Sequence, residues 1–80
     1  MRRNERYDRI RFLIDSNFEM FYRIIQDNFD EEFVQIFNMY HIERCSFEYI
    51  AGELLTSINT VKKKYYDMLL FIRGYVYGTG

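Results

Sequence analysis

The stretch that decides the fold is Ser46–Arg73, with the sequence SFEYIAGELLTSINTVKKKYYDMLLFIR. Apolar residues recur there at the three- and four-residue spacing of a helix, in two runs on either side of Thr56 and Ser57. The first run is Phe47, Ile50, Ala51 and Leu54, and the second is Val61, Tyr65, Met68 and Ile72. Ser57 is placed to cap the second helix by accepting from the backbone N–H of Asn59 or Thr60. Two amphipathic helices with so short a joint must cross steeply, which predicts a helix-turn-helix.

The second of these helices begins with a polar and cationic surface opposite its apolar face. The exposed positions of its first turns are Ile58, Asn59, Lys62 and Lys63. A helix that enters the major groove of DNA needs such a surface, because Asn suits adenine and Lys suits guanine. We therefore expect Asn59 and Lys63 to reach base edges. The residues expected to contact phosphates are Ser57, Thr60 and Lys62, with Lys64 on the flank and Tyr66 as a candidate for a further phosphate hydrogen bond. In the alternative interpretation, the lysine run is a solvated face and Tyr66 lies at a subunit contact.

This segment resembles a known family. The helix-turn-helix in region 4 of sigma-70-type RNA polymerase factors is similar to Ile50-Ala51-x-x-Leu54 followed by Ser57-x-x-Thr60-Val61-Lys62-Lys63. The resemblance spans roughly residues 30 to 73, and small phage regulators of late transcription share the pattern. The family usually has Gly at the position of Leu55 and an apolar residue at Thr56, and a positive φ is costly for Leu. A full sigma factor also needs a promoter-melting region, for which 80 residues are too few. The resemblance therefore implies a promoter-binding or polymerase-binding fragment of phage or bacterial type.

The composition favours one small helical domain. Among 80 residues there are eight Phe, eight Tyr and no Pro, and hydrophobic residues make up 49%. Few helix breakers and many large side chains predict an all-α fold, a bundle of four or five helices around one core. We divide it into an N-terminal helical segment (residues 1–28), the sigma region-4-like unit (residues 29–74) and a tail (residues 75–80).

The N-terminal third has helical periodicity that fits either one helix or two. Residues 4–14 and 17–27 read either as two helices or as one helix over residues 4–27, and Ser16 with Glu19 is a possible capping box between them. The apolar positions expected to be buried ahead of the helix-turn-helix are Tyr7, Ile10, Leu13, Ile14, Phe18, Phe21, Tyr22, Ile25, Phe33, Ile36, Phe37 and Tyr40.

Further helix ends are predicted from capping chemistry. Asn28 is expected to end a helix in the left-handed conformation, and the acidic residues 30–32 to begin the next one. Ser46 is expected to cap the first motif helix. Gly74 is a natural C-cap for the last helix, which leaves residues 75–80 as a loose end or a strand-like arm.

Charge is unevenly distributed along the chain. The net charge of −1 divides into +3 over residues 1–14, −7 over residues 15–53 and +3 over residues 54–80. Basic ends can bind DNA because the phosphate contribution depends on local charge. The acidic middle suggests a face for a protein partner, at Glu31 and Glu32. The residues expected to form a basic arm over the DNA backbone or in the minor groove, or otherwise to aid solubility, are Arg2, Arg3 and Arg6.

Residues with catalytic or metal-binding potential are few. His41, Glu43 and Cys45 offer at most three zinc ligands, and Cys45 with His41 lacks an orienting third group for nucleophilic catalysis. We interpret His41 as a structural or surface histidine and Cys45 as a small buried hydrophobe. No metal, no cofactor and no enzyme activity are expected. No apolar run is long enough for a membrane span, so we expect a cytoplasmic protein without a membrane contact.

The chain has more large apolar residues than one small monomer easily buries. The surplus positions are Phe12, Met20, Ile24, Phe29, Val34, Tyr66, Phe71, Tyr75 and Tyr77. Such a surplus predicts a homodimer through the N-terminal helices, with two recognition helices one DNA turn apart. The main hypothesis is a transcription regulator that binds double-stranded DNA. The alternative is a phage-type inhibitor or adaptor that binds a host factor, such as RNA polymerase, its sigma subunit or a defence nuclease, through the acidic and aromatic surface.

Overall fold

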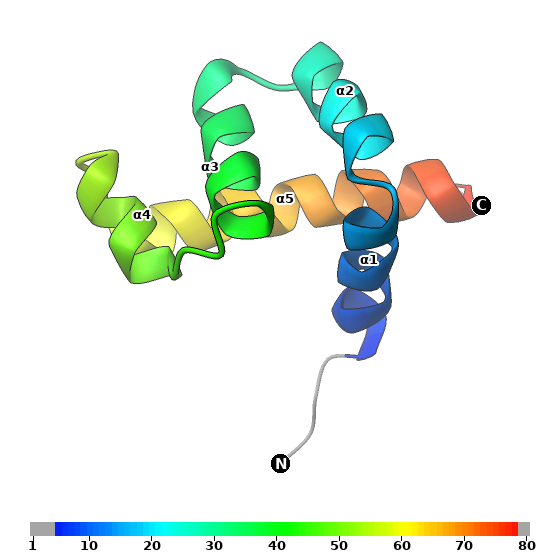
Figure 1. The fold of residues 1–80 in the computed structure, drawn as a ribbon, viewed down its shortest axis with the longest axis horizontal. Coiled ribbons are helices and arrows are strands. Elements are labelled where there is room, and N and C mark those ends of the chain that lie inside the picture. The colour runs from blue at the N-terminus through cyan, green and yellow to red at the C-terminus, as the bar shows by residue number, and fades with distance from the viewer. Residues whose placement is uncertain (1–4, 79–80) are drawn as a thin grey trace.

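The structure is a computed structural model that describes residues 5–78, with side chains described from Tyr7 onward. These residues form five α-helices and no strand, so the all-α prediction is confirmed (Figure 1). The helices are α1 (Glu5–Ser16), α2 (Phe18–Asn28), α3 (Glu31–His41), α4 (Phe47–Glu53) and α5 (Ile58–Tyr77).

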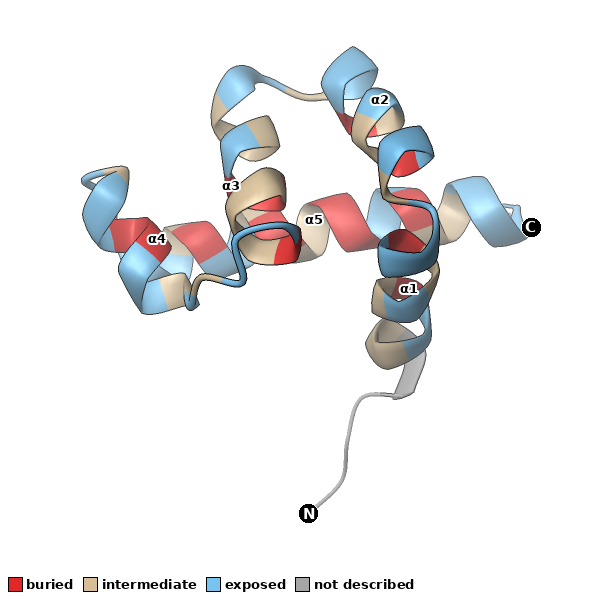
Figure 2. Cartoon of the chain, viewed as in Figure 1, coloured by how far each residue is buried: buried red, intermediate tan, exposed pale blue. Residues whose placement is uncertain are grey.

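The longest helix, α5, is the spine of the molecule (Figure 1). α4 packs near its N-terminal end, α3 crosses its middle and α1 crosses closer to its C-terminal end, while α2 packs on α1 and α3. Buried positions lie where these helices face α5, and both ends of α5 carry exposed residues (Figure 2). The spine therefore has one covered face and a solvent-facing surface at each end.

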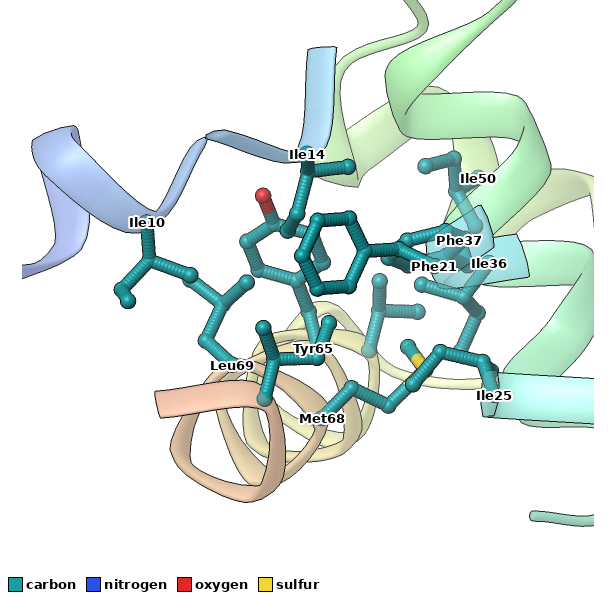
Figure 3. Close-up of a cluster of buried hydrophobic side chains, with 13 residues drawn as sticks. Ile10, Ile14, Phe21, Ile25, Ile36, Phe37, Ile50, Tyr65, Met68 and Leu69 are labelled. Atoms are coloured by element: carbon teal, nitrogen blue, oxygen red, sulfur yellow. The ribbon is translucent and has the colours of Figure 1, made fainter. Parts of the chain in front are cut away.

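The core confirms the predicted helical stripes. Tyr65, Met68 and Leu69 lie at its centre, against side chains from the other helices (Figure 3). Thirteen hydrophobic residues of the described chain are buried: Ile10, Ile14, Phe21, Ile25, Ile36, Phe37, Ile50, Ala51, Val61, Tyr65, Met68, Leu69 and Ile72. Burying one of the larger of these side chains contributes about 1.5–3 kcal/mol to the free energy of unfolding. All of them except Leu69 are predicted stripe positions, including the four of the last helix. The other predicted stripe residues are half-buried: Tyr7, Leu13, Phe18, Tyr22, Phe33, Tyr40, Phe47 and Leu54.

The N-terminal third forms two helices, which settles the open choice between one helix and two. The predicted capping box is wrong. Ser16 is the last residue of α1 and its Oγ donates to the Phe12 carbonyl at 2.9 Å, so it is not an N-cap. The break lies at Asn17, whose backbone is not helical, with φ −138° and ψ 45°. Its N–H still donates to the carbonyls of Leu13 and Ile14, both at 3.1 Å, and its side chain makes no cap hydrogen bond to α2.

The predicted left-handed end at Asn28 is also wrong. Asn28 stays helical, with its Nδ2 donating to the Ile24 carbonyl at 2.8 Å, and Phe29 leaves the helix in an extended conformation with φ −136°. The side-chain amide completes the last turn, so no left-handed residue is required. The expected start of α3 is confirmed, since Glu31 and Glu32 occupy its first turn.

The predicted C-cap at Gly74 is wrong, because α5 continues to Tyr77. Gly78 ends the helix instead, with φ 82°. Residues 75–77 are thus neither a loose end nor a strand, while Thr79 and Gly80 lie outside the described residues. A helical Gly costs about 1 kcal/mol relative to Ala, which the packing of neighbouring Ile72 in the core offsets.

The apolar surplus is divided between the interior and the surface. Ile24, Phe29, Val34 and Tyr66 pack against the core and are half-buried. Phe29 contacts Phe33 and Phe71, with ring centroids 4.9 and 5.3 Å apart. The surplus residues that remain exposed are Phe12, Met20, Phe71, Tyr75 and Tyr77.

Candidate nucleic-acid interface

The N-terminus of α5 is built by Ser57. Its Oγ accepts from the backbone N–H of Thr60 at 3.1 Å and donates to Thr60 Oγ1 at 2.8 Å, which confirms the predicted cap. Ser46 caps α4 in the same way by accepting from Tyr49 N–H at 3.1 Å. A capping serine is worth about 1 kcal/mol. Both hydroxyls predicted to hold phosphates, those of Ser57 and Thr60, therefore take part in the cap.

The turn between α4 and α5 closes through backbone hydrogen bonds. Thr56 N–H donates to the Ala51 carbonyl at 2.9 Å and Leu55 N–H to the Gly52 carbonyl at 3.3 Å. This is the pairing of a Schellman motif, which needs a left-handed residue at the position of Leu55. Leu55 has φ 57° and its side chain is 91% exposed. The turn thus has the left-handed conformation for which Gly is usually selected. Leu occupies it here, at a cost in backbone strain of about 1–2 kcal/mol.

Four predicted contact residues lie at the surface of the first turns of α5. Asn59, Lys62 and Lys63 are exposed, and Ile58 is 38% exposed. Lys63 Nζ lies 3.4 Å from Asp67 Oδ2, an exposed pair that is worth less than about 1 kcal/mol. Lys62 and Asn59 make no side-chain hydrogen bond or ion pair with the part of the chain that the structure describes.

Lys64 and Tyr66 are engaged inside the molecule. Lys64 Nζ lies 2.7 Å from Glu32 Oε1, so two residues predicted for different surfaces form one ion pair. Arg11 Nη2 donates to Tyr66 Oη at 2.7 Å, and Tyr7 packs edge-on against the Tyr66 ring. Glu31 remains exposed beside this pair on α3. Arg2, Arg3 and the Arg6 side chain lie outside the described residues.

A buried polar chain links α1, α3 and α5, and sequence reasoning missed it. His41, 3% exposed, has Nδ1 3.0 Å from Asp15 Oδ1 and Nε2 2.9 Å from Tyr65 Oη. Because a carboxylate only accepts, Nδ1 carries the proton, and Nε2 of the neutral ring accepts from the Tyr65 hydroxyl. Arg11 Nε donates to Tyr65 Oη at 3.3 Å. The available signal was the four-residue spacing of Arg11 and Asp15, which puts both on one face of α1.

Burial shifts the pKa values of His41 and Tyr65 in this hydrogen-bonded network. It lowers the pKa of His41 below its usual value, although the hydrogen bond to Asp15 opposes the shift. Burial likewise raises the pKa of the Tyr65 hydroxyl. His41 is therefore a structural histidine that stays neutral at pH 7, with both ring nitrogens occupied.

The other candidate chemistry is not assembled into a site. Cys45 is half-buried, and burial followed by the Glu43 carboxylate raises the pKa of its thiol. Within residues 5–78, no three His, Cys, Asp or Glu side chains group closely enough to hold a metal ion. A hollow of about 290 Å³ between α3 and α4 is lined by Gln35, Asn38, Met39, Glu43, Glu53 and Leu54. Glu48 and Glu53 are the charged residues of α4, so this helix adds no cation to the surface.

No described helix combines the length and the apolar character needed to cross a membrane. Known protein families, curated protein sequences and solved structures give no match to this chain.

Proposed function

We propose that α4 and α5 act as a DNA-binding helix-turn-helix and that the protein regulates transcription. The observation that carries this proposal is the start of α5, where Asn59, Lys62 and Lys63 are solvent-exposed on a helix whose opposite face is fully buried. A helix held this way can enter the major groove without disturbing the core. A homodimer would present two such segments to one duplex.

The exposed residues suit distinct roles at the duplex. Asn59 fits adenine through paired donor and acceptor groups, and Lys63 fits guanine. Lys63 must first leave Asp67, which costs little because the pair is exposed. Lys62 is free to contact phosphate. Ser57 supports the site indirectly, since its cap orients the backbone N–H groups of the helix N-terminus, where phosphate binding is favoured.

Two predicted contacts take a different part in this proposal. Lys64 would have to give up a 2.7 Å ion pair with Glu32, and Tyr66 a 2.7 Å hydrogen bond from Arg11. Both residues therefore hold α5 against α3 and α1 in the proposed complex. DNA affinity then depends mainly on Lys62 and Lys63, together with Arg2, Arg3 and Arg6 if these form an arm.

The test replaces Lys62 and Lys63 with Glu and measures binding to promoter-containing and random duplexes at roughly 50 and 200 mM salt. We expect an affinity loss of at least about 100-fold and a salt slope lower by about 2, with unchanged folding. The matched control combines Arg9→Glu with Gln26→Glu and Gln35→Glu, which makes the same change in net charge at exposed positions outside α5. Equal losses in both variants would reject a specific role for α5.

A second candidate function is a protein-binding module that targets RNA polymerase or another host factor. Leu55 favours it, because a 91% exposed leucine stands where Gly would avoid the backbone strain, and a partner that covers this side chain would account for its presence. The two acidic residues of α4, Glu48 and Glu53, would suit a basic partner. Binding to purified RNA polymerase that is lost in Leu55→Ser or Glu31→Lys, but kept when Lys62 and Lys63 are changed, would support this function over DNA binding. Glu32 is unsuitable as a probe because its loss frees Lys64.

A further inference from the structure

An exposed apolar surface covers α2 and the C-terminal end of α5, and we call it the α2–α5 patch. Its members are Met20 and Ile24 of α2 with Leu70, Phe71 and Tyr75 of α5. Met20 is 49% exposed, Leu70 47% and Tyr75 60%. A hollow of about 710 Å³ is lined by the apolar residues Phe18, Met20, Ile24 and Tyr75 and by the polar residues Ser16, Asn17, Glu19 and Arg23. A second hollow, of about 300 Å³, is lined by Leu70, Phe71, Gly74 and Tyr75. Tyr75 lines both, so the two hollows adjoin.

Gly74 gives the second hollow its shape. It lies inside α5, where a Gly costs about 1 kcal/mol, and it does not end the helix. With no side chain there, the surface is indented between Leu70, Phe71 and Tyr75. An indentation rimmed by apolar side chains on a helix can receive an apolar side chain from a facing helix, as a knob enters a hole.

The charges around the patch of one copy complement those around the patch of a second copy. The larger hollow includes one acid and one base, Glu19 and Arg23, both exposed on α2. In α5, Arg73 is the one charged residue between Leu70 and Tyr77, and it is half-buried. DNA would need a cationic surface here. Across a twofold axis, however, Glu19 of each copy can meet Arg23 of the other while the apolar centres face each other.

We propose that the α2–α5 patch is the interface of a homodimer in which the C-terminal ends of two α5 helices cross antiparallel. The sequence predicted a dimer through the N-terminal helices. The proposal keeps the second of these helices, α2, and adds the end of α5. It leaves Phe12, 69% exposed on α1, outside the patch.

The length of α5 sets the spacing between the two recognition segments, and this step rests on the proposed DNA-binding function. From position 61, the centre of the exposed cationic segment, to position 73, the centre of the patch on α5, the helix rises about 18 Å at 1.5 Å per residue. Two copies that cross antiparallel at position 73 therefore separate their segments by about 36 Å. One turn of DNA is about 34–36 Å, so both segments would meet successive major grooves on one face.

The first test is sedimentation of the full chain without DNA, from roughly 1 to 100 µM. We expect a dimer for the wild type and monomers for Leu70→Glu and Tyr75→Glu, each with an unchanged helical spectrum. Tyr49→Glu on α4, a site of similar exposure (55%) outside the patch, should stay dimeric. A monomeric wild type at 100 µM, or a dimer that survives both patch substitutions, would overturn the proposal.

Charge swapping tests the twofold pairing. Glu19→Arg alone and Arg23→Glu alone each place like charges across the axis, so each should weaken the dimer by at least about tenfold. A mixture of the two variants should form a heterodimer, because each copy then meets the opposite charge. If Glu19 and Arg23 only stabilise α2 itself, mixing the two variants would not restore dimer formation. Failure to form the heterodimer would therefore overturn the pairing.

Spin labels at Lys62→Cys in a Cys45→Ala background test the orientation. Antiparallel crossing places the labels roughly 30–45 Å apart, whereas parallel packing would place them within about 20 Å. A short distance would overturn the arrangement. These measurements contain no DNA, so failure of the DNA-binding proposal would leave the dimer intact. Conversely, a monomer that still binds DNA would reject only the dimer.

Discussion

Both ends of α5 carry exposed side chains, but these side chains differ in chemistry. The N-terminal end presents Asn59, Lys62 and Lys63, and the C-terminal end presents Leu70 and Tyr75. Between them the helix is buried on one face. The first surface suits a charged, hydrated ligand such as DNA, and the second suits another apolar surface.

This difference teaches that burial and chemistry carry separate information. The periodicity of α5 decides which residues enter the core, whereas the kind of residue left outside indicates the partner. The middle of the helix keeps the two ends at a fixed separation, since Tyr65 is tied to α1 and α3 through Arg11 and His41. Changes in the middle should therefore disturb both ends together, and changes at one end should leave the other unaltered.

The largest expected effect comes from breaking the middle. Leu69→Ala removes a fully buried side chain at the centre of the core and should lower the free energy of unfolding by about 2–5 kcal/mol. This is a large part of the stability of so small a domain. Urea denaturation followed by circular dichroism would measure it.

The neighbouring residue supplies the control. Leu70→Ala, at a 47% exposed position, should change the stability by less than about 0.5 kcal/mol when measured at low micromolar concentration, where the proposed dimer contributes least. Similar losses in the two variants would mean that the two faces of α5 are not distinct.

A smaller loss of stability is expected when only the hydrogen bonds between Tyr65, His41 and Arg11 are removed. Tyr65→Phe keeps the ring packed but leaves His41 Nε2 buried without a donor and removes one acceptor from Arg11. The expected cost is about 1–3 kcal/mol. Tyr66→Phe is the comparison, because it removes a single half-buried contact and should cost about 1 kcal/mol or less. An equal or smaller loss for Tyr65→Phe would argue against the buried chain.

Local patterns predicted much of this fold. The stripe through Val61 and Ile72 follows from helical spacing, and the caps at Ser46 and Ser57 follow from short-range chemistry. The errors at Ser16, Asn28 and Gly74 share a physical cause. Each residue is typical of a helix end, but the neighbouring turn or the core determined its conformation instead. Propensity at a single position is weaker than the packing of the adjacent residues.

The polar centre could not be predicted for a different reason. Tyr65 lies 24 residues from His41 and 54 from Arg11, so no local spacing connects them. The same applies to Lys64 and Glu32, 32 residues apart, which the sequence placed on separate surfaces. The exposed residues Asn59, Lys62 and Lys63 were predictable because exposure on one helix follows from periodicity alone.

The turn before α5 allows a test of what Leu55 contributes at the N-terminal end of this helix. Leu55→Gly should raise the stability by about 1 kcal/mol or less, because Gly accepts φ 57° without strain and the exposed leucine side chain contributes no packing. Such a gain raises the Tm of a domain of this size by several degrees. Leu55→Ala keeps the strained backbone and should show no gain. A loss of stability in Leu55→Gly would mean that the side chain makes a contact in solution.

The smallest expected effect is a pH dependence of the stability that originates at His41, which hydrogen-bonds both Tyr65 of α5 and Asp15 of α1. Burial lowers the pKa of His41 in the folded state relative to about 6.5 in the unfolded chain, and Asp15 offsets part of this shift. The unfolded state therefore binds the proton more readily. Stability should be constant above about pH 7 and should fall as the pH drops through 6.5 toward the folded pKa. Protonation would also turn Nε2 into a donor toward a Tyr65 hydroxyl that already accepts from Arg11, which leaves the hydroxyl proton without a partner. Thermal unfolding between pH 5.5 and 7.5 would show a declining Tm for the wild type and a flatter profile for His41→Gln. A wild-type Tm that rises on acidification would mean that the Asp15 carboxylate outweighs burial, and the buried chain would then be strongest with His41 charged.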